Sequence, residues 1–105
     1  MDITVQHFND CPNWLTTIER IEQVVEQTGT NATVRLQLIT TPEAAEAHSF
    51  RGSPTVLIDG LDPFADADVP VGLSCRVYTT PDGLAGSPTI DQIAGAITQS
   101  SGAHR

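Results

Sequence analysis

The sequence predicts an α/β domain whose elements follow in the order β-α-β-α-β-β-α, with a four-stranded mixed sheet and helices on both faces. Three observations predict this class. Residues 2–8 alternate in side-chain direction as a strand does. Residues 12–28 carry apolar side chains at helical spacing. Short strand-like and helix-like runs then continue along a chain of 105 residues, which is the size of one domain.

The first half of the chain predicts two parallel strands joined by a helix. Pro12 suits the start of this helix, because the first helical position needs no N–H group. Gly29 suits its end, where a left-handed residue is common. The second strand is expected over residues 33–40, and the helix between the strands predicts a right-handed crossover.

The second half predicts a short helix, two antiparallel strands and a last helix. The short helix has Pro42 in its first turn and ends near Phe50, and Thr89 begins the last helix with capping-box spacing to Gln92. Helices on both sides would bury the two faces of the sheet. The predicted ranges are 55–59 and 74–79 for the strands, 1–99 for the domain and 100–105 for a flexible tail.

The charge and the apolar pattern exclude several classes of partner. Thirteen acidic residues outnumber five arginines and give a net charge of −8, which repels phosphate backbones and anionic lipid. We therefore expect neither nucleic acid nor a membrane as partner. The acidic, alternating start is unlike a signal peptide, and no apolar run approaches the ~20 residues of a membrane span. These features favour a cytoplasmic protein, whose two cysteines are expected to be thiols.

Two short motifs occupy informative places in this order of elements. Cys11-Pro12-Asn13-Trp14 lies where the first strand gives way to a helix, and Gly52-Ser53-Pro54-Thr55 comes directly before the third strand. Together they resemble the thioredoxin superfamily over residues 2–99, with Trp14 in place of the second cysteine of C-x-x-C. The resemblance implies a minimal thioredoxin fold in which a cis proline, Pro54, faces the Cys11 thiol. Residues 50–64 (FRGSPTVLIDGLDPF) and 72–89 (GLSCRVYTTPDGLAGSPT) also resemble small bacterial thioredoxin-like proteins, some of which are labelled alkylmercury lyase.

Cys11 is the candidate catalytic residue. A thiol at the start of a helix faces unpaired N–H groups and the positive end of the helix dipole, and both favour the nucleophilic thiolate. The adjacent Asp10 opposes this, because a second negative charge nearby raises a thiol pKa. Cys11 could alternatively be a residue that the fold retains without chemistry.

Three groups of residues would complete the substrate site. Pro12 would shape the start of the helix, and Trp14 would shield the sulfur and offer an aromatic wall to a substrate. Ser53, Pro54 and Thr55 would form a backbone platform on which an extended substrate pairs like an added strand. The expected substrate is a thiol or a disulfide, of a protein or a small molecule, and no cofactor is expected.

Two redox routes are open to a motif that lacks its second cysteine. In one, Cys11 attacks a mixed disulfide alone and a small thiol resolves it. In the other, Cys75 is the resolving partner. The expected fold argues against the second route, because the third strand runs away from the site and Cys75 lies near the start of the next strand. A disulfide needs Cα atoms within about 7 Å. Otherwise Cys75 is a small apolar filler.

Two functions without redox catalysis remain alternatives. The first is a binding module, or a homodimer, suggested by the lost cysteine and by apolar residues in the long segment 60–73. The second is a thiol ligand for soft metal ions or organomercurials. His7, Cys11, His48 and Cys75 lack the spacing of a structural zinc site, so we expect no metal site and place both histidines at a surface or a helix end.

Overall fold

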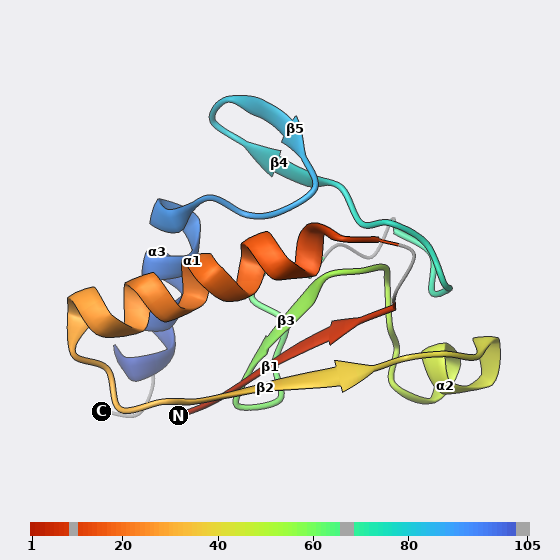
Figure 1. The fold of residues 1–105 in the computed structure, drawn as a ribbon, viewed down its shortest axis with the longest axis horizontal. Helices are drawn as coiled ribbons and strands as arrows, with labels where there is room; N and C mark the ends of the chain where they lie inside the picture. Colours follow the sequence, from red (N-terminus) through yellow and green to blue (C-terminus); the bar gives the residue numbers. More distant parts are fainter. Residues whose placement is uncertain (9–10, 66–68, 103–105) are drawn as a thin grey trace.

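The computed structural model describes residues 1–8, 11–65 and 69–102 and forms a small α/β domain (Figure 1). Its elements alternate much as the sequence predicts, and one short strand is added near the end. They are β1 (Asp2–His7), α1 (Asn13–Thr28), β2 (Thr33–Leu38), α2 (Pro42–Ala47), β3 (Thr55–Ile58), β4 (Tyr78–Thr80), β5 (Gly83–Ala85) and α3 (Ile90–Gly102). In the described part of the chain, no helix is both long and apolar enough to cross a membrane.

The main sheet has three strands in the order β2-β1-β3. β1 and β2 are parallel, with Val5 beside Leu36, as the crossover predicts. β3 pairs antiparallel with β1, with Val56 beside Val5. The prediction of a fourth strand in this sheet is wrong. β4 pairs instead with β5 in a separate hairpin around the turn at Pro81 and Asp82.

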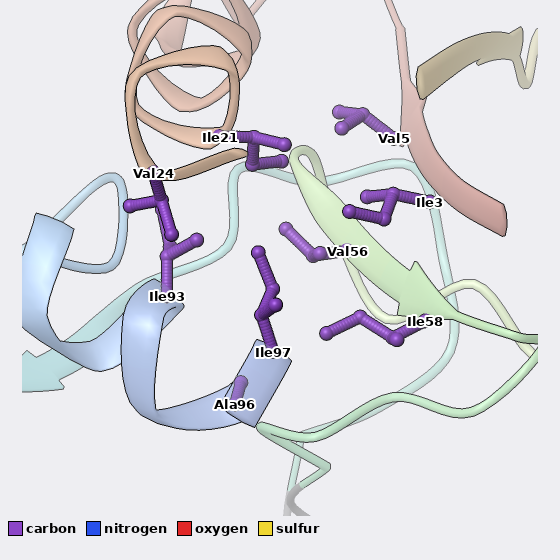
Figure 2. Close-up of a cluster of buried hydrophobic side chains, with 9 residues drawn as sticks. All are labelled: Ile3, Val5, Ile21, Val24, Val56, Ile58, Ile93, Ala96 and Ile97. Carbon is purple, nitrogen blue, oxygen red and sulfur yellow. The ribbon is translucent and has the colours of Figure 1, made fainter. Parts of the chain in front are cut away.

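The main core lies on one face of this sheet. Ile3 and Val5 on β1 pack with Val56 and Ile58 on β3 (Figure 2). α1 and α3 cover these side chains and contribute the rest of the cluster, namely Ile21, Val24, Ile93, Ala96 and Ile97. Burying such aliphatic side chains stabilises a fold by ~2 kcal/mol each, so this layer is the main reason why β1, β3 and the two helices stay together.

The second face of the sheet does not carry the helix that we expected. Thr4, Gln6, Arg35 and Gln37 alternate with the core residues and therefore point to that face. Such polar side chains offer little apolar surface for a helix to bury. The six-residue helix α2 instead lies beyond the carboxyl end of β2 (Figure 1).

The helix ends explain why these segments fold locally as they do. Gly29 ends α1 in the left-handed conformation, with φ at 66°. Thr41 caps α2 by accepting a hydrogen bond from the Ala44 N–H. Thr89 and Gln92 form both bonds of the predicted capping box at α3. α3 continues to Gly102, through part of the predicted tail, whose residues 103–105 lie outside the described part.

Candidate functional site

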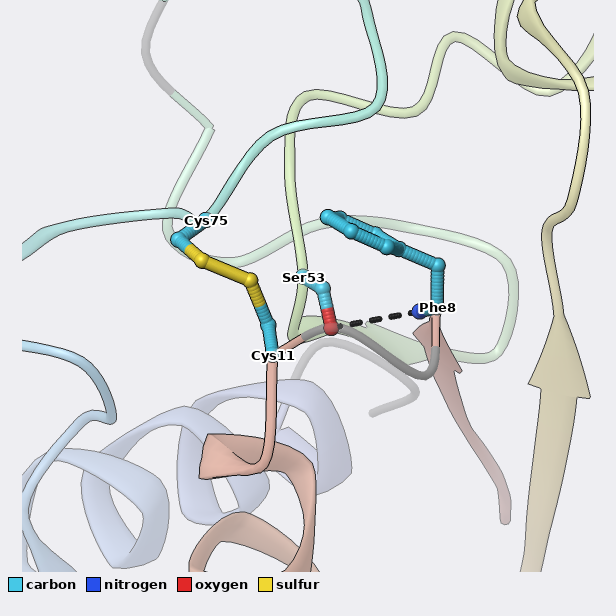
Figure 3. Close-up of a disulfide and its surroundings, with 4 residues drawn as sticks. All are labelled: Phe8, Cys11, Ser53 and Cys75. Atoms are coloured by element: carbon cyan, nitrogen blue, oxygen red, sulfur yellow. Dashed lines mark hydrogen bonds between the residues drawn. A yellow bond between two sulfur atoms is a disulfide. The ribbon is translucent and has the colours of Figure 1, made fainter.

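The two cysteines are joined to each other. Cys11 lies just before α1, and a disulfide connects it to Cys75, 64 residues later (Figure 3). The two Cα atoms are 5.9 Å apart. No cysteine in the described part of the chain is free. The expectation of two thiols and of a remote Cys75 is therefore wrong.

The path of the long segment explains this correction. After β3 the chain returns to the start of that strand, so that residues 74–76 run beside Ser53. Ser53 and Cys75 form an isolated parallel bridge. The Ser53 N–H donates to the Ser74 carbonyl at 2.8 Å, and the Arg76 N–H donates to the Ser53 carbonyl at 2.9 Å. Cys75 is thereby placed beside the Cys11 end of the sheet instead of the opposite end.

The proposed platform residues lie against residues 74–78, which we call the returning segment. The Ser53–Pro54 peptide is cis, as the family resemblance implies. Ser53, Pro54 and Thr55 are all buried. The Tyr78 hydroxyl donates to the Pro54 carbonyl at 2.5 Å, and Arg76 donates to the Thr55 hydroxyl at 3.2 Å. In the disulfide-bonded protein, the returning segment therefore occupies the edge that we expected a substrate to use.

The close fit of the returning segment depends on a glycine. Gly52 has φ at 115°, which side chains rarely adopt. A Cβ atom built on Gly52 would lie 3.0 Å from both the Cβ and the backbone nitrogen of Arg76. Glycine therefore both permits the turn before Ser53 and makes room for Arg76.

Arg76 is the anchor of this segment, and the sequence did not single it out. Its side chain is 3% exposed and forms an ion pair with Asp62 at 2.7 Å. It also donates to the Phe64 carbonyl and lies over the Tyr78 ring, 4.7 Å from the centroid. Burial raises the pKa of Tyr78 above its ordinary value, a shift that the nearby Arg76 charge partly opposes, so the hydroxyl stays protonated as a donor. The signal that could have found Arg76 is its two-residue spacing from Tyr78, which places both side chains on one face.

Pro12 and Trp14 flank the disulfide on the α1 side. Pro12 is exposed and takes the N-cap position of α1, one residue before the first helical position. Trp14 is half-buried against the main core. Its ring stacks on His7, with centroids 4.4 Å apart. Trp14 therefore packs on the end of β1, next to the helix start that carries Cys11.

His7 is buried, which corrects its expected surface position. It is 6% exposed, and its Nδ1 atom has no hydrogen-bond partner among the described residues. Burial lowers the pKa of His7 below its ordinary value of 6.5, because the charged form would lose its hydration. His48 is exposed and caps the end of α2, as the sequence predicts.

The segment 60–73 folds back onto the body of the domain where the structure describes it. Phe64 packs against the main core and meets the Tyr78 ring edge-on at 5.6 Å. Arg51 donates to the Val69 carbonyl. Asp66 and Asp68 of this segment, like Asp10 next to Cys11, lie outside the described residues. Leu61 stays 75% exposed.

Chemically, the site holds a disulfide at a helix start beside a cis proline loop. Within the described residues, no three His, Cys, Asp or Glu side chains gather in a way that could hold a metal ion. In comparisons with known proteins, no family model, no curated protein and no solved structure matches the chain.

Proposed function

We propose that the chain is a thioredoxin-like cytoplasmic protein whose Cys11 and Cys75 undergo thiol–disulfide exchange with a thiol or disulfide substrate. The observation that carries the proposal is the position of the Cys11–Cys75 bond, at the start of α1 and beside the cis Ser53–Pro54 peptide. The finer fold assignment, a minimal thioredoxin fold, belongs to the same proposal. Disulfides in a reducing compartment are usually transient and catalytic, which agrees with a bond that cycles.

The pair replaces the single-cysteine route that the sequence favoured. Cys11 has its partner on another segment instead of three residues along the helix. Reduction would give two adjacent thiols, and oxidation would return two electrons and two protons to the substrate disulfide. The N–H groups at the start of α1 and the helix dipole would stabilise the Cys11 thiolate when the bond opens.

Redox titration tests this function. We would equilibrate the native protein in buffers of reduced and oxidised glutathione, and count thiols by mass after alkylation. The proposal predicts a reversible two-thiol transition and reduction of a mixed-disulfide substrate. Cys11→Ser and Cys75→Ser are the controls, and both should lose the two-thiol transition. A disulfide that resists the whole glutathione range would refute the proposal.

A second candidate is a binding or dimerisation module without chemistry. Cys11 is 1% exposed, and the platform edge at Ser53 is already covered, which would suit a structural disulfide. Sedimentation of the native protein tests this candidate. A dimer that persists at micromolar concentration, together with a redox-inert disulfide, would favour it over the exchange function.

A third candidate is a soft-metal or organomercurial ligand, which would require the reduced state. The two sulfurs are adjacent, so reduction would place two thiolates side by side. Mercury titration of the reduced protein tests this candidate. Binding no tighter than that of Cys11→Ser, which keeps one thiol, would exclude a two-thiolate site.

A further inference from the structure

We infer that Cys75 is the sulfur that exchanges with the substrate and that Cys11 is the buried resolving thiol. This inference rests on the proposed function and reverses the roles expected from the sequence. The two ends of the disulfide differ sharply in exposure: Cys11 is 1% exposed, whereas Cys75 is an exposed residue. Its neighbours Ser74 and Val77 are exposed too.

Exposure decides which sulfur an incoming thiolate can attack. Exchange requires direct attack on one sulfur while the other leaves, so its rate depends on access to the attacked atom. Cys11 is enclosed at the start of α1, where its N–H group donates to the Phe8 carbonyl at 3.3 Å. The accessible side of the bond is therefore the Cys75 side. Attack there makes Cys11 the leaving group, at the helix start that stabilises a thiolate.

The anchors of the returning segment keep Cys75 in place after the bond opens. The hydrogen bonds of Ser74 and Arg76 to Ser53 do not involve the sulfurs. Arg76 is held independently by Asp62 and Phe64. Cys75 therefore remains beside Cys11 in the reduced protein, and the second step of exchange is intramolecular.

The same contacts restrict the class of substrate. The N–H and carbonyl groups of Ser53 are both paired within the chain, so a substrate does not pair with them as an added strand. Recognition then occurs mainly at the sulfur. A small disulfide, or a disulfide protruding from a protein surface, fits this requirement better than an extended peptide.

The protein would then reduce a substrate disulfide in two steps. The Cys75 thiolate attacks one substrate sulfur, forms a mixed disulfide on Cys75 and releases the first substrate thiolate. The Cys11 thiolate attacks the Cys75 sulfur, which re-forms the Cys11–Cys75 bond and releases the second thiolate. The substrate gains two electrons, and the protein pair loses them. A cellular dithiol would reduce the pair for the next cycle.

Single-cysteine variants test the assignment, with 5,5′-dithiobis(2-nitrobenzoate) and glutathione disulfide as probes. Cys11→Ser, which keeps Cys75, should form mixed disulfides at about the rate of a free exposed thiol. Cys75→Ser, which keeps Cys11, should react at least roughly tenfold more slowly while folded. Both should react alike in denaturant. Faster reaction of folded Cys75→Ser would overturn the assignment but leave the exchange function intact.

A measurement on the natural protein covers the case in which a variant fails to fold. Brief exposure to limiting glutathione, acid quenching and peptide mapping would locate the first glutathione adduct. We expect it on Cys75, and an adduct mainly on Cys11 would refute the inference. Absence of any adduct at any glutathione ratio would instead count against the proposed function itself.

Discussion

Arg76, the residue after the exposed Cys75, forms a nearly enclosed ion pair with Asp62. Their side chains meet at 2.7 Å and are 3% and 17% exposed. The contact ties the segment that carries Cys75 to the segment that follows β3. A charge this deeply buried is costly to leave without its partner.

Asp62→Ala should therefore destabilise the fold strongly. Removing one partner of a buried pair costs about 3–5 kcal/mol, and this variant also loses the Asp62 bond to the Phe64 N–H. The matched control is Asp2→Ala, because Asp2 pairs with Arg35 at the surface, with side chains more than 60% exposed. That pair should contribute less than ~1 kcal/mol. Urea unfolding followed by fluorescence of Trp14, the one tryptophan in the chain, measures both. Equal effects of the two variants would contradict the anchoring role of Arg76.

Reduction of the disulfide should lower the free energy of unfolding substantially while the chain stays folded. A bond that closes a loop with a separation of 64 residues stabilises by about 4 kcal/mol in the chain-entropy model. Unfolding with and without dithiothreitol measures this difference. Cys75→Ser should resemble the reduced protein and should not respond to dithiothreitol. A reduced protein as stable as the oxidised one would show that the contacts of Arg76 and the hydrogen bonds to Ser53 hold residues 74–76 without the disulfide.

The local signals of the sequence predicted the part of the fold that depends on neighbours in the chain. Helical spacing, Gly29 and the Thr89 capping box placed α1 and α3 well. Alternation predicted β1, and the intervening helix predicted its parallel pairing with β2. Each of these features depends on contacts within one element or on a short connection.

The site was predicted only in part, because its decisive contact joins distant segments. The motifs at Cys11 and Pro54 were placed correctly, and the cis peptide was expected. The pairing of Ser53 with Cys75 has no periodic signal, since it is a single bridge and not a ladder. Reading residues 74–79 as a strand of the main sheet placed Cys75 at the wrong end. A buried arginine in that run was also difficult to predict, because charged residues are seldom buried without a partner.

Gly52→Ala should loosen the returning segment. Its cost has two parts: a φ of 115° that alanine resists, and a Cβ atom 3.0 Å from Arg76. Gly60→Ala is the matched control, because Gly60 has φ at 85° and no atom within 4 Å of a built Cβ. The control should cost ~1–2 kcal/mol, because an L-residue resists the left-handed conformation, and Gly52→Ala should cost clearly more. Gly52→Ala should also slow re-formation of the disulfide after reduction, measured by thiol alkylation over time. Equal effects at the two glycines would mean that the segment adjusts freely around position 52.

His7 should make stability depend on pH on the acidic side of neutrality. Because burial lowers the folded-state pKa of His7 below its ordinary value of 6.5, the unfolded chain binds a proton in this window that the folded chain does not. Stability should therefore fall as the pH drops below about 6.5, by at most ~1.4 kcal/mol per pH unit from this residue. His7→Phe keeps an aromatic ring against Trp14 and removes the buried Nδ1, so it should flatten this slope and be at least as stable at neutral pH. His48→Phe, at an exposed position, is the control that should keep the slope. The carboxylates are the same in all of these proteins. The difference in the pH dependence of stability between the two variants therefore reports the contribution of His7. An unchanged slope in His7→Phe would show that the ring is hydrated or paired when charged, and that its burial does not oppose protonation.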